Sequence, residues 1–394
     1  MNKIGIMPAT SRSQCQVMAV AAVAFAALSN PGGVTAEEGN PYGQIGVPLE
    51  EHMPSEIRSV DGELRVELTL DAWYYDGFPA KFWTRAFNGE WPAPTLRVRR
   101  GDAVHLHFEN ALKANRDPGE HNTFRLPNTT NLHTHGLHVS GEGSADNIRV
   151  TIEPEGSFDY HYVIEPDHAP GTHWYHPHFH GATAVQVGGG AAGALIVEEE
   201  ESDLPPEILG YTEKVIVMQH IYARTSDMWG LYQVSEASMD DLFFPSYEPT
   251  GNADPDLRGS WWLMNGLYQP TISIQPGEWQ RWRFVTSAVD KGLIVTIVDK
   301  DPSRRNLRNG PAPPPPPVSA PCEILLLSKD GVTVSPAPRA VEVMYFNAAT
   351  RADILIRCDE LGEYDMISTP RTGRDVSDCT LGTIVVGGET VRSP

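Results

Sequence analysis

Short runs in which polar and apolar residues alternate constrain the fold of this chain most strongly. Residues 63–70 (ELRVELTL) and 103–109 (AVHLHFE) carry an apolar side chain at every second position, which is the period of a half-buried β-strand. Turn-forming pairs such as Asp61-Gly62, Asn88-Gly89 and Gly101-Asp102 punctuate the runs. Helical periodicity is scarce beyond the N-terminal segment. The pattern predicts an all-β protein made of sandwiches.

The chain is long enough for two domains. Its 394 residues exceed the usual size of a single hydrophobic core, and 40% of them are hydrophobic. A charged run with two prolines, residues 198–206, marks the expected boundary, which predicts domains at 37–200 and 206–390. Residues 306–321 include five consecutive prolines, and we interpret them as an extended surface insert in the second domain.

Residues 1–36 have the pattern of a secretory signal peptide. Lys3 and Arg12 supply positive charge before the apolar run 17–28, and small residues end the segment before Glu37. The apolar run is shorter than the roughly 20 residues that a membrane-spanning helix needs. We therefore expect a secreted or otherwise extracytoplasmic protein. The net charge of −21 argues against nucleic acid and anionic membranes as partners.

Two histidine-rich strings predict a metal site. Residues 131–136 (NLHTHG) contain His133 and His135, and residues 174–181 (WYHPHFHG) contain His176 and His178. On a β-strand the two histidines of an H-x-H share one face, with backbones roughly 7 Å apart. Two such pairs on neighbouring strands would direct four imidazoles into one pocket. Imidazole clusters suit copper, zinc, iron or nickel, so we expect a transition metal.

The other histidines give weaker signals. His180 extends the second string on the same face, and we expect it to orient or pack against the ligands. His138 and His173 are ambiguous in the same way. His105 and His107 also form an H-x-H, but apolar residues take the core face of their strand, so both are expected on the solvent face. The rest show no partner pattern: His52, His121, His161, His168 and His220.

These strings resemble the first cupredoxin domain of the multicopper oxidases. The resemblance extends upstream to residues 87–102 (FNGEWPAPTLRVRRGD) and downstream to 193–197 (GALIV), and residues 265–284 are similar to that family's second domain. It covers roughly residues 60 to 390. The resemblance implies two tandem cupredoxin-like Greek-key β-sandwiches.

The resemblance also assigns roles to the four histidines. By the family's pattern, His133 would bind the type 2 copper, and His135, His176 and His178 would bind the paired type 3 coppers. The implied activity is the oxidation of a reducing substrate, not identified by the sequence, coupled to the reduction of dioxygen to water. No catalytic residue beyond the metal ligands is implied.

Half of the ligands of the family's three-copper cluster, and its type 1 copper site, have no counterpart in this sequence. A complete member has four further histidines and a type 1 copper held by a cysteine and two histidines, in a third domain. Here His220 is the only histidine after His180, and no cysteine stands beside a histidine. Cys15 would leave with the signal, and the other three, Cys322, Cys358 and Cys379, allow one disulfide whose partners the sequence does not select.

Four hypotheses follow. The first, which we rank highest, is a multicopper oxidase-like chain whose third domain is missing from the sequence. The second is a secreted copper-binding protein without catalysis. The third is a subunit completed by a partner chain; a second copy would bring the histidines to eight but would still lack the thiolate site. The last is a zinc hydrolase, which ranks lowest because no paired general base accompanies the histidines.

Overall fold

A computed structural model describes residues 44–77, 81–115, 125–223, 259–289, 291–300, 322–368 and 379–391. The predicted signal segment 1–36, the proline-rich insert 306–321 and His121 lie outside these residues. Among the helices in the described ranges, none has the length and apolar character needed to cross a bilayer.

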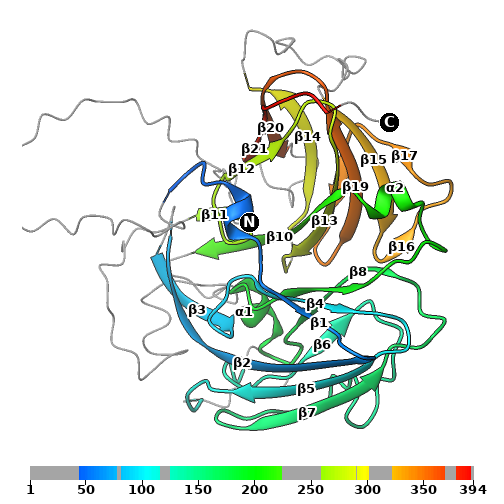
Figure 1. Cartoon of the computed structure of the whole chain (residues 1–394). Coiled ribbons are helices and arrows are strands. Elements are labelled where there is room, and N and C mark those ends of the chain that lie inside the picture. Colours follow the sequence, from blue (N-terminus) through cyan, green and yellow to red (C-terminus); the bar gives the residue numbers. More distant parts are fainter. Residues whose placement is uncertain are drawn as a thin grey trace, which may run out of the picture.

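Two sheets form the N-terminal sandwich, in the lower half of Figure 1. The five-stranded sheet has the order β1 (Glu56–Arg58), β4 (Ala93–Val98), β9 (Gly193–Val197), β8 (Gly171–His176), β6 (His133–His135). The four-stranded sheet has the order β3 (Lys81–Phe87), β2 (Glu63–Asp76), β5 (Ala103–Asn110), β7 (Ser157–Val163). A short 3-10 helix, η2 (Leu49–His52), precedes β1, and α1 (Thr183–Gly188) follows β8.

The C-terminal sandwich also has two sheets. The first has the order β11 (Gly259–Met264), β10 (Thr212–Ala223), β13 (Trp279–Ser287), β19 (Arg351–Cys358), β15 (Cys322–Lys329), β16 (Val332–Thr333), and β17 (Arg339–Ala340) also pairs with β15. The second has the order β12 (Thr271–Ile274), β21 (Cys379–Val386), β20 (Gly362–Ser368), β14 (Leu293–Asp299), β18 (Met344–Phe346). In the sequence, α2 (Pro206–Leu209) lies on the segment that connects the two sandwiches.

The sequence pattern explains these strands. In β5 the side chains of Val104, Leu106 and Phe108 are buried in the core of the N-terminal sandwich, while His107 is exposed. Several neighbouring strands are parallel and far apart in the sequence, as β2 is with β5 and β10 with β13. Such pairs need connections that cross between sheets, as in Greek-key sandwiches. The all-β prediction is confirmed.

An apolar cluster joins the two sandwiches. Trp174, Ala194 and Ile196, from β8 and β9, pack with Val217 and Val285, from β10 and β13. These strands lie where the two halves of the molecule meet in Figure 1. Because β8 also carries a histidine of the predicted metal site, the interface and that site share a strand.

A buried ionic network lies beside this apolar cluster. Arg283 on β13 binds Glu199 at 2.6 Å, Glu213 at 2.6 Å and Asp353 at 2.9 Å. Arg281 binds Glu199 and, at 2.8 Å, Asp353. Burial alone would raise the pKa of Glu199, but the two guanidinium groups outweigh it and lower that pKa to about 2. Glu199 belongs to the charged run at the predicted domain boundary. Its buried carboxylate binds Arg281 and Arg283 of the C-terminal sandwich.

One disulfide joins two of the three cysteines that the sequence left open. Cys322 on β15 and Cys358 on β19 are opposite each other in the register, with Cα atoms 4.2 Å apart, and their sulfurs are bonded. Both residues are buried in the core of the C-terminal sandwich.

Candidate metal centre

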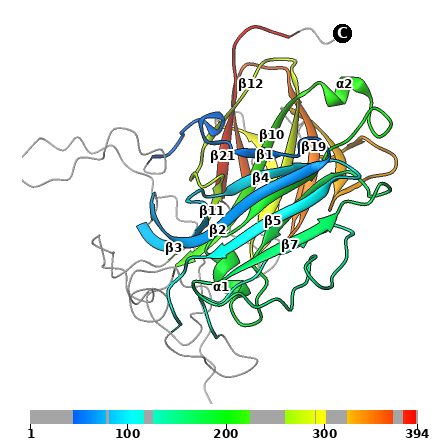
Figure 2. The same ribbon diagram turned by 60° about the horizontal axis from the view of Figure 1, so that its bottom comes forward.

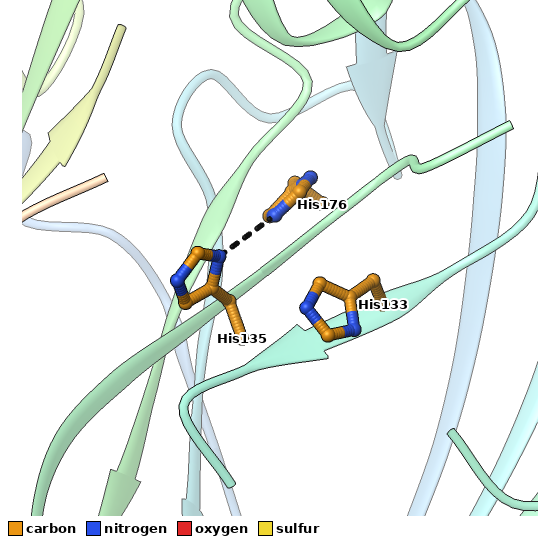
Figure 3. Close-up of side chains that lie close together, drawn as sticks. All are labelled: His133, His135 and His176. Carbon is orange, nitrogen blue, oxygen red and sulfur yellow. Dashed lines mark hydrogen bonds between the residues drawn. The ribbon is translucent and has the colours of Figure 1, made fainter. Parts of the chain in front are cut away.

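Two adjacent strands bring three of the predicted ligands together. In the antiparallel pair β6 and β8, His133 is opposite His176. Each of His133, His135 and His176 has a ring nitrogen within 4.8 Å of a ring nitrogen of the other two. Figure 3 shows the three rings facing one another, with His135 Nδ1 and His176 Nε2 3.4 Å apart. In the part of the chain that the structure describes, this is the one group of three such ligand atoms.

His178 lies beside this group but outside the strand. Its ring centroid is 5.1 Å from that of His133 and 5.8 Å from that of His176. We expected an extended H-x-H, but β8 ends at His176, because Pro177 has no N–H to continue the ladder. The backbone N–H of His178 instead donates to Asn131 Oδ1 at 2.7 Å. We call His133, His135, His176 and His178 the histidine cluster.

Hydrogen bonds orient two of the rings. Nδ1 of His133 is 2.9 Å from Asp146 Oδ2, and Nδ1 of His176 is 2.8 Å from the carbonyl oxygen of Pro177. An acceptor at Nδ1 places the ring proton there and leaves the lone pair on Nε2. His176 also stacks on Trp174, with centroids 4.0 Å apart. Both rings therefore present Nε2 in the form that a metal ion binds.

Replacing Asp146 by asparagine is expected to weaken metal binding about 10- to 100-fold, the usual cost of losing such a partner. Asp146 Oδ1 accepts the backbone N–H of Thr134 at 2.8 Å. An asparagine that kept this bond would turn its amide N–H toward His133 Nδ1 and move the ring proton to Nε2. Copper titration of the two proteins measures the change. Equal affinities would show that Asp146 has no orienting role.

Burial keeps the rings of His135, His176 and His178 neutral. It is the main cause that lowers the pKa of His135 to about 4, with Arg351 as the next cause, and it lowers that of His176 well below its usual range. Burial likewise lowers the pKa of His178. Neutral imidazole is the form that ligates metals, so no deprotonation is needed at neutral pH.

The same effect predicts acid destabilisation of the metal-free protein. Burial lowers the pKa of His173 and of His220 to about 3, against 6.5 for an exposed ring. The unfolded chain therefore takes up protons first as the pH falls below 6.5, and stability is lost down to the folded pKa. At pH 5 the expected loss is about 2 kcal/mol for each histidine, at 1.36 kcal/mol per pKa unit. Urea unfolding with a chelator at pH 7 and pH 5 measures it; identical curves would contradict the prediction.

Arg351 and the turn at Asp330-Gly331, both from the C-terminal sandwich, lie next to the histidine cluster. Arg351 Nη2 donates to the carbonyl oxygen of Asp330 at 2.9 Å, and the guanidinium lies against Gly136. A Cβ on Gly136 would be 2.4 Å from Arg351 Nη2, and the φ of Gly136 is +92°. Gly331 likewise lies against the ring of His173. Glycine at position 136 thus lets the second sandwich close over the end of β6.

The remaining predicted histidines have other surroundings. His180 is exposed and lines, with His178, a surface depression. It follows the end of β8, so the strand alternation that placed it beside the ligands was wrong. His173 is buried, and neither ring nitrogen has a hydrogen-bond partner among the described residues. His168 Nε2 accepts the backbone N–H of His138 at 2.8 Å. His105 and His107 lie on the solvent face of β5, as expected.

Two polar residues of the site escaped the sequence reasoning. Asp146 follows His135 by 11 positions, in a loop with no strand pattern. Asn131 is fully buried, and its Nδ2 donates to the carbonyl oxygens of Ile148 and Val150 at 2.9 and 3.1 Å. Only its position two residues before His133 hinted at a role. Both act through the fold of the 140–150 loop, which local periodicity does not encode.

Comparisons with known proteins find similarity to multicopper oxidases. A sequence model described as multicopper oxidase matches residues 121–202, which contain all four histidines. An iron transport multicopper oxidase, FET3 of Gibberella zeae, is 31% identical over 212 residues, covering 53% of this chain and 28% of that protein. The chain therefore spans less than a third of this curated relative.

Solved structures share the fold. A multicopper oxidase from Campylobacter jejuni, described as a metallo-oxidase, has a TM-score of 0.60 and 19% identity, covering 90% of this chain and 64% of that one. A multicopper oxidase named mgLAC has a TM-score of 0.56 and 19% identity, covering 86% of this chain and 88% of that one. The two sandwiches are thus cupredoxin-like.

Proposed function

Since this chain belongs to the multicopper oxidase family, we propose that its histidine cluster binds copper and forms half of a site at which dioxygen is reduced to water. One observation carries the proposal. Ring nitrogens of three histidines come within 4.8 Å of one another, and acceptors at Nδ1 leave Nε2 of His133 and His176 available. The donor set is all imidazole, which suits copper.

The ligand roles follow the family's pattern. His133 would hold the type 2 copper, and His135, His176 and His178 the type 3 pair. Bound copper would supply one-electron transfer and a place for dioxygen. The chain's own residues hold the ligands: Asp146 keeps the proton on His133 Nδ1, the Pro177 carbonyl does so for His176, and Trp174 fixes the plane of the His176 ring.

The complete reaction needs groups that this sequence does not carry. Reduction of one dioxygen to two waters consumes four electrons and four protons, drawn from a reducing substrate. In the family a cysteine-ligated type 1 copper collects those electrons, and no cysteine here stands beside a histidine. We propose that a further domain of a longer chain supplies it, together with the remaining histidines. A partner chain is the alternative source, and copper binding without catalysis is the second alternative.

Copper counting and activity assays test the proposal. The purified chain is loaded with copper, dialysed, and examined by metal analysis and electron paramagnetic resonance. We expect bound copper without the intense blue thiolate absorption, and no oxidation of ferrous ion or a phenol by this chain alone. A variant with all four cluster histidines changed to alanine should retain none of that copper. Equal copper in both proteins would overturn the proposal.

The alternatives give different results in the same assay. Oxidase activity that appears when the chain is extended at its C-terminus supports a missing domain, whereas activity that appears only with a second polypeptide supports a partner. Copper retention without turnover in every preparation supports a copper-binding protein. We also propose secretion through the signal at 1–36; a mature N-terminus at Glu37 is expected, and an intact Met1 on secreted protein would contradict it.

A further inference from the structure

A second histidine pair lies on the other sheet of the N-terminal sandwich. His105 on β5 and His161 on β7 are directly opposite each other in the antiparallel register. Their Nδ1 atoms are 3.0 Å apart and their ring centroids 4.4 Å apart. The backbone N–H of His161 points away from β5 and donates to the carbonyl oxygen of Ser144. The two residues thus form a non-hydrogen-bonded pair, the kind in which cross-strand side chains approach most closely.

The next cross-strand pair on this face adds a third imidazole and a carboxylate. His107 is opposite Asp159, and His107 Nδ1 is 2.6 Å from Asp159 Oδ1. A carboxylate at Nδ1 holds the proton there and leaves the lone pair of His107 on Nε2, as in many metal-ligating histidines. We call His105, His107, Asp159 and His161 the outer histidine patch.

The charges around the patch favour a cation. Arg65, opposite His105, is turned to Glu63, with Nη2 and Nε 2.6 and 2.9 Å from Glu63 Oε2. Glu67 is opposite His107, so two carboxylates, Glu67 and Asp159, flank the imidazoles. The patch residues, together with Arg65 and Glu67, line a shallow depression. The four-stranded sheet lies toward the viewer in Figure 2, and the side chains of His107 and Asp159 are 46% and 85% exposed, so water can complete the coordination of an ion.

We propose that the outer histidine patch is a surface site for a divalent transition metal, with His105 and His161 as a chelating pair and Cu²⁺ as the preferred ion. Metal–imidazole bonds are about 2.0–2.1 Å long, so nitrogens 3.0 Å apart subtend an angle of about 91–97° at a shared ion. This is the angle between neighbouring ligands in the square-planar or tetragonal geometry of Cu²⁺ and Ni²⁺. Tetrahedral zinc would need the two nitrogens about 3.3–3.4 Å apart.

The site is separate from the histidine cluster. The patch lies on β5 and β7 of the four-stranded sheet, whereas the cluster lies on and just after β6 and β8 of the five-stranded sheet. The proposal therefore does not depend on the proposed oxidase function. Because the patch is partly exposed and offers two preset nitrogens, it would exchange its ion readily with solution and bind it more weakly than a closed site does.

Metal titration of single variants tests the site. CuCl₂ is titrated calorimetrically into the full chain, into His105→Gln and His161→Gln, and into His138→Gln, which removes an exposed histidine outside the patch. We expect each patch variant to lose the weaker class of sites, with affinity reduced at least about tenfold because a chelate becomes a single imidazole. The control should match the unmodified chain. Circular dichroism confirms that each variant is folded.

Chemical modification supplies a readout at the level of residues. Diethyl pyrocarbonate acylates accessible imidazole nitrogens, and mass spectrometry locates the products. We expect Ni²⁺ or Cu²⁺ to protect His105 and His161 together while leaving His138 reactive. Unchanged titration curves in both patch variants, or modification of His105 and His161 unaffected by either ion, would overturn the proposal and leave a hydrogen-bonded surface pair.

Discussion

Replacing His176 by alanine is expected to reduce copper binding at the histidine cluster by at least about 100-fold, the upper end of the effect of losing an orienting partner. His176 is opposite His133 in the register, and its Nε2 is 3.4 Å from His135 Nδ1. Its ring is buried and neutral, and the Pro177 carbonyl and Trp174 fix its orientation. Metal analysis after dialysis against a weak chelator measures the loss.

His180→Ala is the matched control for that experiment. It removes a histidine from the same string, but its side chain is exposed, and the strand that aligns His176 ends before it. Copper retention should therefore match that of the unmodified chain. If His180→Ala lost as much copper as His176→Ala, the assignment of His176 as a ligand and of His180 as a non-ligand would be contradicted.

Replacing Asp353 by alanine is expected to destabilise the protein by about 3–5 kcal/mol, the cost of removing one partner from a buried ion pair. The side chains of Arg283 and Asp353 are 1% and 0% exposed. Asp353 Oδ2 accepts from Arg281 and Arg283, and Oδ1 accepts from Thr172 on β8 at 2.6 Å. The variant leaves two buried guanidinium groups sharing the remaining carboxylates. Urea unfolding measures the change.

Glu363→Gln provides the comparison for this ion pair. Glu363 binds Lys300 at 2.6 Å, but the two side chains are 52% and 49% exposed, so solvent screens the pair. The expected change is within about 1 kcal/mol. A destabilisation by Asp353→Ala no larger than that of Glu363→Gln would show that the buried network does not hold the sandwiches together.

Strands β2 and β5 were predictable because each follows a local period, whereas β4, β8 and β9 are buried at every position and show no alternation. The alternation in residues 63–70 and 103–109 became β2 and β5, with β2 continuing to Asp76. The charged run 198–206 was visible in the sequence and is where we predict the domain boundary, but the role of Glu199 within it was not visible. Its two arginine partners stand more than 80 positions away and meet it only when β13 packs against the N-terminal sandwich.

In the candidate metal site, too, some features were predictable from the sequence and others were not. The two histidine strings identified four candidate ligands, since residue type and spacing carry that information. The predicted alternation of side chains failed at Pro177, where β8 ends. The backbone N–H of His178 donates instead to Asn131, which belongs to the other histidine string. Asp146 and Arg351 reach the histidines from a loop and from the second sandwich, at distances in sequence that no motif spans.

By itself, the sequence indicated the all-β architecture, the resemblance to multicopper oxidases and four candidate metal ligands, because side-chain period and ligand chemistry are local properties. The tertiary structure alone decided which cysteines pair, which carboxylate orients His133, and that His105 and His161 meet across two strands. Those outcomes depend on the register and packing of segments distant in the chain, where a shift of one residue would turn each side chain to the opposite face.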